Sequence, residues 1–230
     1  MLQLDDLLRN KKTVGIAGHV NPDGDCVGSC LGVYNYVRTY HKDIDVQVYL
    51  DPFPTIFNFL TGSKDIIPAD GSDKAFDLFI ALDCGDERRL GNSAPYFKAS
   101  MHTLCIDHHE SNDSFAETNY IHPKRSSTCE LIMELINADK ITKEIAECLY
   151  TGMMTDTGVF KYSSTTSETM RKAGILMDTG IDFGQIIDSV FYAKTYHQNQ
   201  IMGQALLKAK LHADGRIISS IIEKEEMDRF

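Results

Sequence analysis

The chain has 230 residues, enough for one large domain or for one domain and part of another. Hydrophobic residues make up 43% of it and charged residues 24%, which is the composition of a globular protein and argues against a disordered chain. The formal net charge of −10 argues against a protein that grips long nucleic acid, because such binding needs many Lys and Arg side chains against the phosphates.

The N-terminal residues 1–12 lack the apolar stretch and cleavage site of a signal peptide, and no apolar run approaches about 18 residues. We therefore expect a cytoplasmic protein that makes no use of a membrane. The cysteines form no Cys-x-x-Cys pairs, so we expect reduced thiols and no structural zinc site. They are Cys26, Cys30, Cys84, Cys105, Cys129 and Cys148.

The first half of the chain predicts a sheet with parallel strands. Residues Thr13–Gly18 have the pattern of a short buried strand, and Val27–Tyr40 has apolar residues at helical spacing. Later apolar runs are short and do not alternate with polar residues, as expected of strands that are buried on both faces. These runs are Ile44–Leu50, Phe76–Leu82 and Met101–Ile106. The pattern indicates an α/β fold with a mostly parallel sheet flanked by helices.

Helices are predicted through the second half of the chain. Several begin with capping-box patterns, namely Ser127-x-x-Glu130, Thr165-x-x-Glu168 and Asp182-x-x-Gln185. The expected helices are Ser127–Asn137, Lys143–Met154, Ser167–Thr179 and Phe183–Tyr192.

The last part of the chain predicts a helical linker and a single strand. Residues Thr195–Leu211 have a helical pattern, Ala213–Arg216 has that of a turn, and Ile217–Ile222 has that of a strand without a hairpin partner. We therefore expect this strand to open a second domain whose remainder is absent.

Three potential metal ligands lie between the first strand and the first long helix. His19, Asp23 and Asp25 fall within seven residues, at the carboxyl edge where open α/β sheets bind their ligands. Pro22 and Gly24 favour a tight turn, which lets an imidazole and two carboxylates converge. Taken alone, the segment is also compatible with an Asp that only caps the helix.

Further acids and histidines follow other predicted elements. Asp83 comes directly after one strand, and Asp107, His108 and His109 come after the next. Asp is common in turns, but adjacent histidines after an apolar strand are harder to explain as surface residues. Asp156 lies at the end of a predicted helix. It is a candidate ligand only because the other segments already supply an incomplete set of metal ligands.

These ligand types suit two hard divalent cations. Carboxylate oxygens favour Mn²⁺ or Mg²⁺, and imidazole shifts the preference toward Mn²⁺, Co²⁺ or Zn²⁺, so Mn²⁺ is our first choice. Two such ions about 3.5–4 Å apart can share a carboxylate and activate a hydroxide that attacks phosphorus. The sequence thus predicts a two-metal phosphoesterase, with Mg²⁺ and Co²⁺ as alternative ions.

At this point the sequence resembles the DHH phosphoesterase superfamily, whose motifs occur here in order. They are His19–Ser29, the acid in Ala81–Asp83, the triplet Asp107–His109, and Thr155–Gly158. The Gly-Asp-x-x-Gly-Ser continuation of the first motif resembles the nanoRNase and pAp-phosphatase branch. The combination is far more specific than any single motif.

The resemblance implies roles for individual residues. His19 and Asp23 are expected on one metal ion, and Asp25, His108 and Asp156 on the other, with Asp83 bridging the two. His109 is expected to face the substrate phosphate. The stretch Arg125–Glu130 resembles a helix start rich in Ser and Thr. Its backbone N–H groups suit an anion, although helix capping explains these residues equally well. The implied substrate-binding residues are His109, Arg125, Ser126 and Ser127, and the implied catalytic residues are His109 and Asp83.

The resemblance also implies a substrate class and a domain plan. The branch hydrolyses very short oligonucleotides, pAp and linear dinucleotides such as pApA. Alternatives are a manganese-dependent inorganic pyrophosphatase and a nucleotide-binding regulatory module without turnover. A homodimer is left open. The expected plan is a catalytic DHH domain at residues 1–192, a linker helix at 193–212 and, at 213–230, the start of an incomplete substrate-binding domain that lacks the branch's Gly-rich, His-containing motif.

Overall fold

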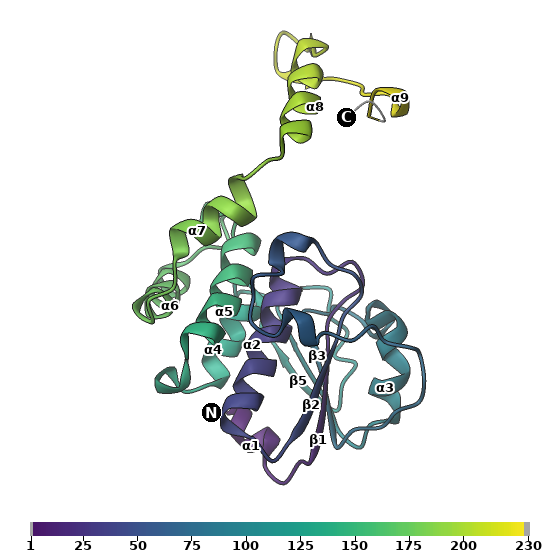
Figure 1. The fold of residues 1–230 in the computed structure, drawn as a ribbon, viewed down its shortest axis with the longest axis vertical. Coiled ribbons are helices and arrows are strands. Elements are labelled where there is room, and N and C mark those ends of the chain that lie inside the picture. Colours follow the sequence, from purple (N-terminus) through teal and green to yellow (C-terminus); the bar gives the residue numbers. More distant parts are fainter. Residues whose placement is uncertain (1, 228–230) are drawn as a thin grey trace. The chain divides into compact units, whose positions relative to one another are not determined.

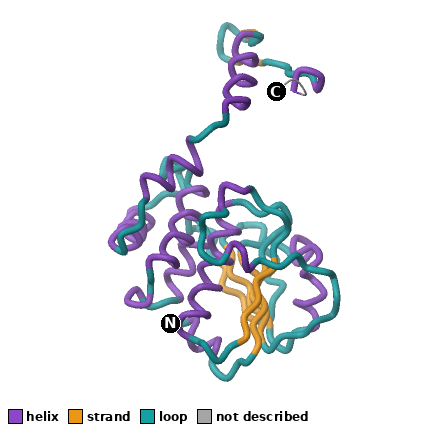
Figure 2. The backbone as a smooth tube through the Cα atoms, in the orientation of Figure 1, coloured by secondary structure: helices purple, strands orange, loops and turns teal. Residues whose placement is uncertain are grey.

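The computed structural model describes residues 2–227, and its centre is a five-stranded sheet in which all strands run parallel. The strand order is β2-β1-β3-β4-β5, and Figure 2 shows the strands as one layer. The predicted α/β class is therefore confirmed. The strands are β1 (Thr13–Ala17), β2 (Asp45–Tyr49), β3 (Leu78–Leu82), β4 (Thr103–Asp107) and β5 (Thr118–Ile121).

Helices cover both faces of this sheet (Figure 1). Helices α2, α4 and α5 lie on one face and α3 lies on the other. The α-helices of this part are α1 (Leu4–Leu8), α2 (Gly24–Tyr40), α3 (Ala94–Ala99), α4 (Thr128–Leu135), α5 (Lys143–Asp156), α6 (Ser167–Asp178) and α7 (Phe183–Ile187). Short 3₁₀ segments occur at Thr55–Phe57, Ser63–Asp65, Glu87–Ser93 and Ala138–Lys140, and a π-helical turn at Asp188–Tyr192.

The central strands are buried on both faces, and alternate side chains enter two separate cores. In β3, Ile80 packs in the larger core with α2 and α5, whereas Phe79 and Ala81 pack in the smaller core. The smaller core is rich in aromatic rings, including Phe76, and it lies against α3. Double-sided burial explains why the strands appear in the sequence as continuous apolar runs.

The strand order places a change of direction between β1 and β3. After β1 the chain passes through α2 to β2 on one side, and β3 then pairs with the other side of β1. Open α/β sheets form a crevice at the carboxyl ends of strands where the order reverses in this way. The residues that follow β1 and β3 are therefore brought together at the edge of the sheet.

The chain divides into two compact units, one up to Phe191 and one from Tyr192 onward. The second unit contains α8 (Tyr196–Leu207), β6 (Lys210–His212), β7 (Ile217–Ser219) and α9 (Lys224–Met227). Strands β6 and β7 pair antiparallel. The expectations of a helix up to Leu211 and of an unpaired strand were therefore wrong, because residues 210–212 form the hairpin partner. The domain plan itself stays a prediction.

Other differences from the predicted elements are local. Strand β5 and helices α1 and α3 were not predicted. Helix α6 is capped by Thr166, whose side chain forms a capping box with Thr169, so the predicted box at Thr165 was displaced by one residue. Within residues 2–227, no helix combines the length and the apolar character that a bilayer crossing requires.

Gly28 allows helices α2 and α5 to pack closely, and this contact is open to test. A Cβ atom at Gly28 would lie 2.5 Å from the carbonyl oxygen of Cys148, so Gly28→Ala must push the helices apart. We expect a loss of about 1–3 kcal/mol in the free energy of unfolding, as for other overpacked cores. Gly174→Ala in α6 is the control, because a Cβ there meets nothing within 4 Å. Urea denaturation measures both, and equal stability of the two variants would contradict the close-contact interpretation.

Candidate metal centre

The segment between β1 and α2 is held by a backbone hydrogen bond to the 3₁₀ segment after β3 and by the cap of α2. The N–H of Val20 donates to the carbonyl oxygen of Arg89 at 2.8 Å, and Asn21 adopts a φ of 56°. Asp23 caps α2, since its Oδ1 accepts from the N–H groups of Asp25 and Cys26, each at 3.1 Å. Capping and convergence therefore occur together, because the tight turn also brings Asp23 near His19.

Asp83 lies at the centre of the cluster, directly after β3. Its side chain is buried, and its two oxygens face different partners. Oδ2 lies 3.5 Å from Nε2 of His19, and Oδ1 lies 3.6 Å from Nε2 of His108. The backbone has a φ of 56°, a conformation that L-residues seldom adopt and that costs about 1–3 kcal/mol.

His19, Asp23 and Asp83 form a first group of potential ligands. Nε2 of His19 lies 3.7 Å from Oδ1 of Asp23 and 3.5 Å from Asp83. The other ring nitrogen, Nδ1, contacts the carbonyl oxygen of Val20 at 2.8 Å. Such a contact fixes the ring and leaves Nε2 available to a metal ion.

Asp25, His108 and Asp156 form a second group. Nε2 of His108 lies 3.3 Å from Oδ2 of Asp156 and 3.9 Å from Oδ2 of Asp25. Its Nδ1 faces the carbonyl oxygen of Arg125 at 3.3 Å. As in the first group, a backbone carbonyl orients the imidazole and directs Nε2 toward the carboxylates.

The structure thus brings together all six residues that the sequence predicted as ligands. Within each group, the potential ligand atoms lie within 4.8 Å of one another, and the same holds for Asp83, His108 and His109. Each group combines imidazole with carboxylate oxygen, a donor set that fits Mn²⁺ and related divalent ions. The residues present therefore fit a pair of cations, with Asp83 placed between the groups.

Asp25 is held by the N-terminus of α4. Its Oδ2 accepts from the N–H of Thr128 at 2.6 Å, and its Oδ1 accepts from the N–H of Cys129 at 3.0 Å. Helix α5 also lies close, since a Cβ at Gly152 would fall 2.8 Å from Oδ1 of Asp25. Three helices therefore converge on this one buried carboxylate.

The pKa values of the cluster reflect burial and mutual repulsion. Burial, with the neighbouring charges of Asp83 and Asp156, raises the pKa of Asp25 well above its usual value. Burial also raises the pKa of Asp156 to about 6, although His108 opposes the shift. Burial lowers the pKa of His19, but Asp23 and Asp83 outweigh it and raise that pKa to about 11. Bound protons therefore offset the repulsion among these carboxylates when cations are absent.

His109 lies at the rim of the cluster and is held by the buried Asp107. Its Nδ1 lies 2.7 Å from Oδ1 of Asp107, whose Oδ2 accepts from the side chain of Asn112 at 2.7 Å. The His109 side chain is 39% exposed. The contact with Asp107 is the main reason why the pKa of His109 is raised. An accessible, oriented imidazole therefore borders the potential ligands.

The remaining predicted substrate-binding residues have internal partners. Nε of Arg125 lies 2.6 Å from Oε1 of Glu134 in α4. Ser126 and Ser127 are buried, and the hydroxyl of Ser126 donates to Glu130 while that of Ser127 accepts from the N–H of Glu130. These contacts favour a structural role for both serines, and their binding of substrate stays a prediction.

Sequence reasoning missed the groups that hold the ligands. The hydroxyl of Thr128 donates to Oδ1 of Asp83 at 3.1 Å, in addition to the N–H contact with Asp25. The sequence signal for these contacts was the Ser- and Thr-rich helix start at Arg125–Glu130. Its pattern predicted a cap or an anion site, but it did not indicate that the bound anions are carboxylates of the same chain.

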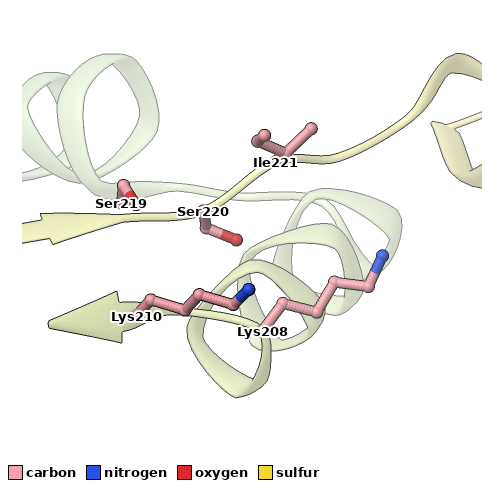
Figure 3. Close-up of a pocket in the computed structure, with 5 residues that line it drawn as sticks. All are labelled: Lys208, Lys210, Ser219, Ser220 and Ile221. Atoms are coloured by element: carbon pink, nitrogen blue, oxygen red, sulfur yellow. The ribbon is translucent and has the colours of Figure 1, made fainter.

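A separate hollow lies within the second unit (Figure 3). Its lining side chains come from the residue directly after α8, from β6, and from the end of β7 and the two residues that follow it. They are Lys208, Lys210, Ser219, Ser220 and Ile221. None of them carries a carboxylate or an imidazole, so this hollow does not have the chemistry of a site for hard cations.

Comparison with known families identifies the relationship of the first unit. A model of the DHH family, N-terminal domain, matches residues 13–153. The chain is 29% identical over 214 residues to the bifunctional oligoribonuclease and PAP phosphatase NrnA of Thermus thermophilus. That match covers 91% of this chain and 63% of the relative, so the chain spans less than two thirds of that relative's length.

Two solved structures resemble the chain. An exopolyphosphatase-related protein from Bacteroides fragilis matches with a TM-score of 0.90 and 31% identity, covering 98% of this chain and 69% of the other. A putative family II inorganic pyrophosphatase from Methanococcus jannaschii matches with a TM-score of 0.58 and 20% identity, covering 76% and 60%. The second match supports a shared fold only.

The raised carboxyl pKa values predict that divalent cations stabilise the chain more at high pH. Without cations, Asp156 contributes stability when protonated, and this is lost as pH rises from the unfolded value of 3.8 through about 6. Cations need ionised ligands and relieve the repulsion, so their effect should grow over the same range. We expect Mn²⁺ to raise the melting temperature more at pH 8 than at pH 5.

Differential scanning fluorimetry measures this difference, and NaCl at matched ionic strength controls for screening. An equal or larger Mn²⁺ effect at pH 5 would contradict competition between protons and cations.

Proposed function

The chain belongs to the DHH family, and we propose that it is a two-metal phosphoesterase that hydrolyses short oligonucleotides and small nucleotides such as pAp and pApA. One observation carries the proposal: the two oxygens of Asp83 face separate groups of ligands, each built from imidazole and carboxylate. An arrangement of this kind suits two cations that act on one phosphate. The name of the Thermus thermophilus relative supports the substrate class.

The ligands divide between the two proposed cations. His19 and Asp23 would hold one and Asp25, His108 and Asp156 the other, while Asp83 is shared. Two bound divalent ions supply a nucleophile from water near neutral pH and neutralise charge on the phosphate oxygens. We propose Mn²⁺ over Mg²⁺ or Co²⁺, because each group offers an imidazole beside hard carboxylate oxygens.

The chain's own residues complete the proposed site. His109 is accessible, and its contact with Asp107 orients the ring and favours its protonated form. A protonated His109 donates to a phosphate oxygen and helps to hold the substrate at the rim. Asp83 also keeps the two groups of ligands at a fixed separation, which positions the phosphate against both cations.

Two other functions are less well supported. The inorganic pyrophosphatase function is supported only by the similarity to the Methanococcus jannaschii structure, and that similarity supports a shared fold alone. A nucleotide-binding module without turnover would not need a complete set of ligands around Asp83. We further propose that the chain binds neither membranes nor long nucleic acid, which is consistent with its net charge of −10. The homodimer and the cytoplasmic location stay predictions from the sequence.

The division of ligands predicts the number of ions lost in each variant. We expect two Mn²⁺ ions per wild-type chain and one in His19→Ala or in Asp156→Ala, because each of these side chains belongs to only one group. Asp83→Ala should weaken both sites. Isothermal titration calorimetry and elemental analysis after dialysis measure the stoichiometry. One ion in the wild type, or unchanged binding in Asp83→Ala, would refute the shared-ligand assignment.

Hydrolysis is tested by incubating the chain with Mn²⁺ and pAp, pApA or an RNA of two to five nucleotides. We expect release of phosphate or mononucleotide, and a loss of at least about 100-fold in Asp83→Asn, which keeps the shape of the side chain but weakens its grip on both cations. Asp43→Asn, an equal change of charge at an exposed position, is the control and should retain full activity.

Substrate comparison separates the alternatives. Phosphate release from pyrophosphate with no action on nucleotides would favour the pyrophosphatase. Binding of two Mn²⁺ ions without hydrolysis of any of these substrates would overturn the enzyme proposal.

A further inference from the structure

The bend before α4 and the first residues of that helix, together called the turn at residues 125–129, contact predicted ligands from three different segments of the chain. The carbonyl oxygen of Arg125 faces Nδ1 of His108 at 3.3 Å. The N–H groups of Thr128 and Cys129 donate to Asp25, and the hydroxyl of Thr128 donates to Asp83 at 3.1 Å. This turn therefore contacts both groups of ligands, since Asp83 belongs to the first group and Asp25 and His108 belong to the second. A shift of the turn would move His108, Asp25 and Asp83 together.

Glu130 holds the turn through hydrogen bonds to Ser126. Its Oε2 accepts from the N–H of Ser126 at 3.0 Å and from the hydroxyl of Ser126 at 2.6 Å. The Glu130 side chain is fully buried, so these donors and its other partners must offset the free-energy cost of removing its charge from water. The predicted capping box at Ser127 is thus only half formed, because the carboxylate reaches Ser126 instead.

The other partners of Glu130 come from helix α6. The hydroxyl of Thr169 donates to Oε2 at 3.0 Å, and Nζ of Lys172 lies 3.1 Å from Oε1. The Lys172 side chain is only 8% exposed, and its second contact is Oε1 of Glu134 at 2.6 Å. A buried ion pair therefore connects α6 to the turn, although no residue of α6 belongs to the predicted ligands.

We propose that the buried ion pair of Glu130 and Lys172 is a positioning device that sets the affinity of both metal sites through the turn at 125–129. The inference rests on the proposed two-metal function and deepens it. Glu130 and Lys172 are positioning residues, because they act on the ligands through the turn. A purely structural role, in which the pair only fastens α6 to α4, is the competing explanation.

Metal affinity measured apart from activity distinguishes these two roles. We expect Glu130→Gln and Lys172→Met each to weaken Mn²⁺ binding by about 10-fold, the lower end of the range for direct partners of metal ligands, because both residues act through the turn. Leu176→Ala is the matched control, because Leu176 is a buried core residue of the same helix with an apolar side chain that forms no contact of this kind. Calorimetric titration gives the affinities, and thermal unfolding ranks the loss of stability.

The positioning role requires weaker Mn²⁺ binding in Glu130→Gln and Lys172→Met than in Leu176→Ala at a similar fall in melting temperature. Affinities that follow the melting temperature in all three variants would overturn it. Ser126→Ala is a milder test that removes one hydroxyl from Glu130. It should weaken Mn²⁺ binding in the same direction, and unchanged Mn²⁺ binding in this variant would count against the inference.

A double variant tests whether the two charges act together. In Glu130→Gln, the amide oxygen can replace Oε2 while the amide NH₂ group faces Nζ of Lys172, so two donors oppose each other. Adding Lys172→Met removes that conflict. We expect the double variant to bind Mn²⁺ more tightly than Glu130→Gln alone, whereas simply additive losses would contradict direct coupling.

The experiment also separates this inference from the proposed function. Wild-type chain that binds two Mn²⁺ ions but hydrolyses no substrate would defeat the phosphoesterase proposal, and the affinities of the variants would still test the ion pair. Active wild type with full Mn²⁺ affinity in Glu130→Gln and Lys172→Met would defeat only the inference.

Discussion

Repulsion among closely placed carboxylates is the constraint on which the rest of the site depends. Two unit charges about 4 Å apart repel by about 4 kcal/mol at an effective dielectric constant of about 20. The potential ligand atoms of each group lie within 4.8 Å of one another, and Asp25 and Asp83 are buried. The backbone donors of α4, the imidazoles and bound protons offset this repulsion in the metal-free chain. The same features make the site ready to exchange protons for cations.

Close packing of helices supplies the geometry that the ligands need. Asp25 is in the first turn of α2, yet its carboxylate lies against the N-terminus of α4 and beside Gly152 of α5. Small residues at these contacts let the three helices approach the sheet edge together. The parallel sheet places Asp83 and His108 at the same edge, because each follows the carboxyl end of a strand. Fold and chemistry are therefore linked through a few backbone contacts.

The sequence predicted the sheet and the six potential ligands because both have local signals. Apolar runs marked β1, β3 and β4, and an acid or histidine followed each of them. Strand β5 was missed because its residues are only half-buried and it lacks an apolar run. The hydrogen bonds from α4 to Asp25 join residues more than 100 positions apart, as in the pair Asp25 and Thr128 with a separation of 103. Such contacts depend on tertiary packing and leave no local pattern.

The left-handed backbone at Asp83 has a consequence for how the chain would respond to selection. A glycine at this position would relieve the strained φ and remove one source of repulsion among the carboxylates, but it would also leave His19 and the hydroxyl of Thr128 without this partner. Screening for thermal tolerance without cations would therefore act on these opposing effects and not on the cation binding for which Asp83 is needed. Engineering for stability and engineering for turnover therefore place different demands on this one position, as expected where a functional residue holds a strained backbone conformation.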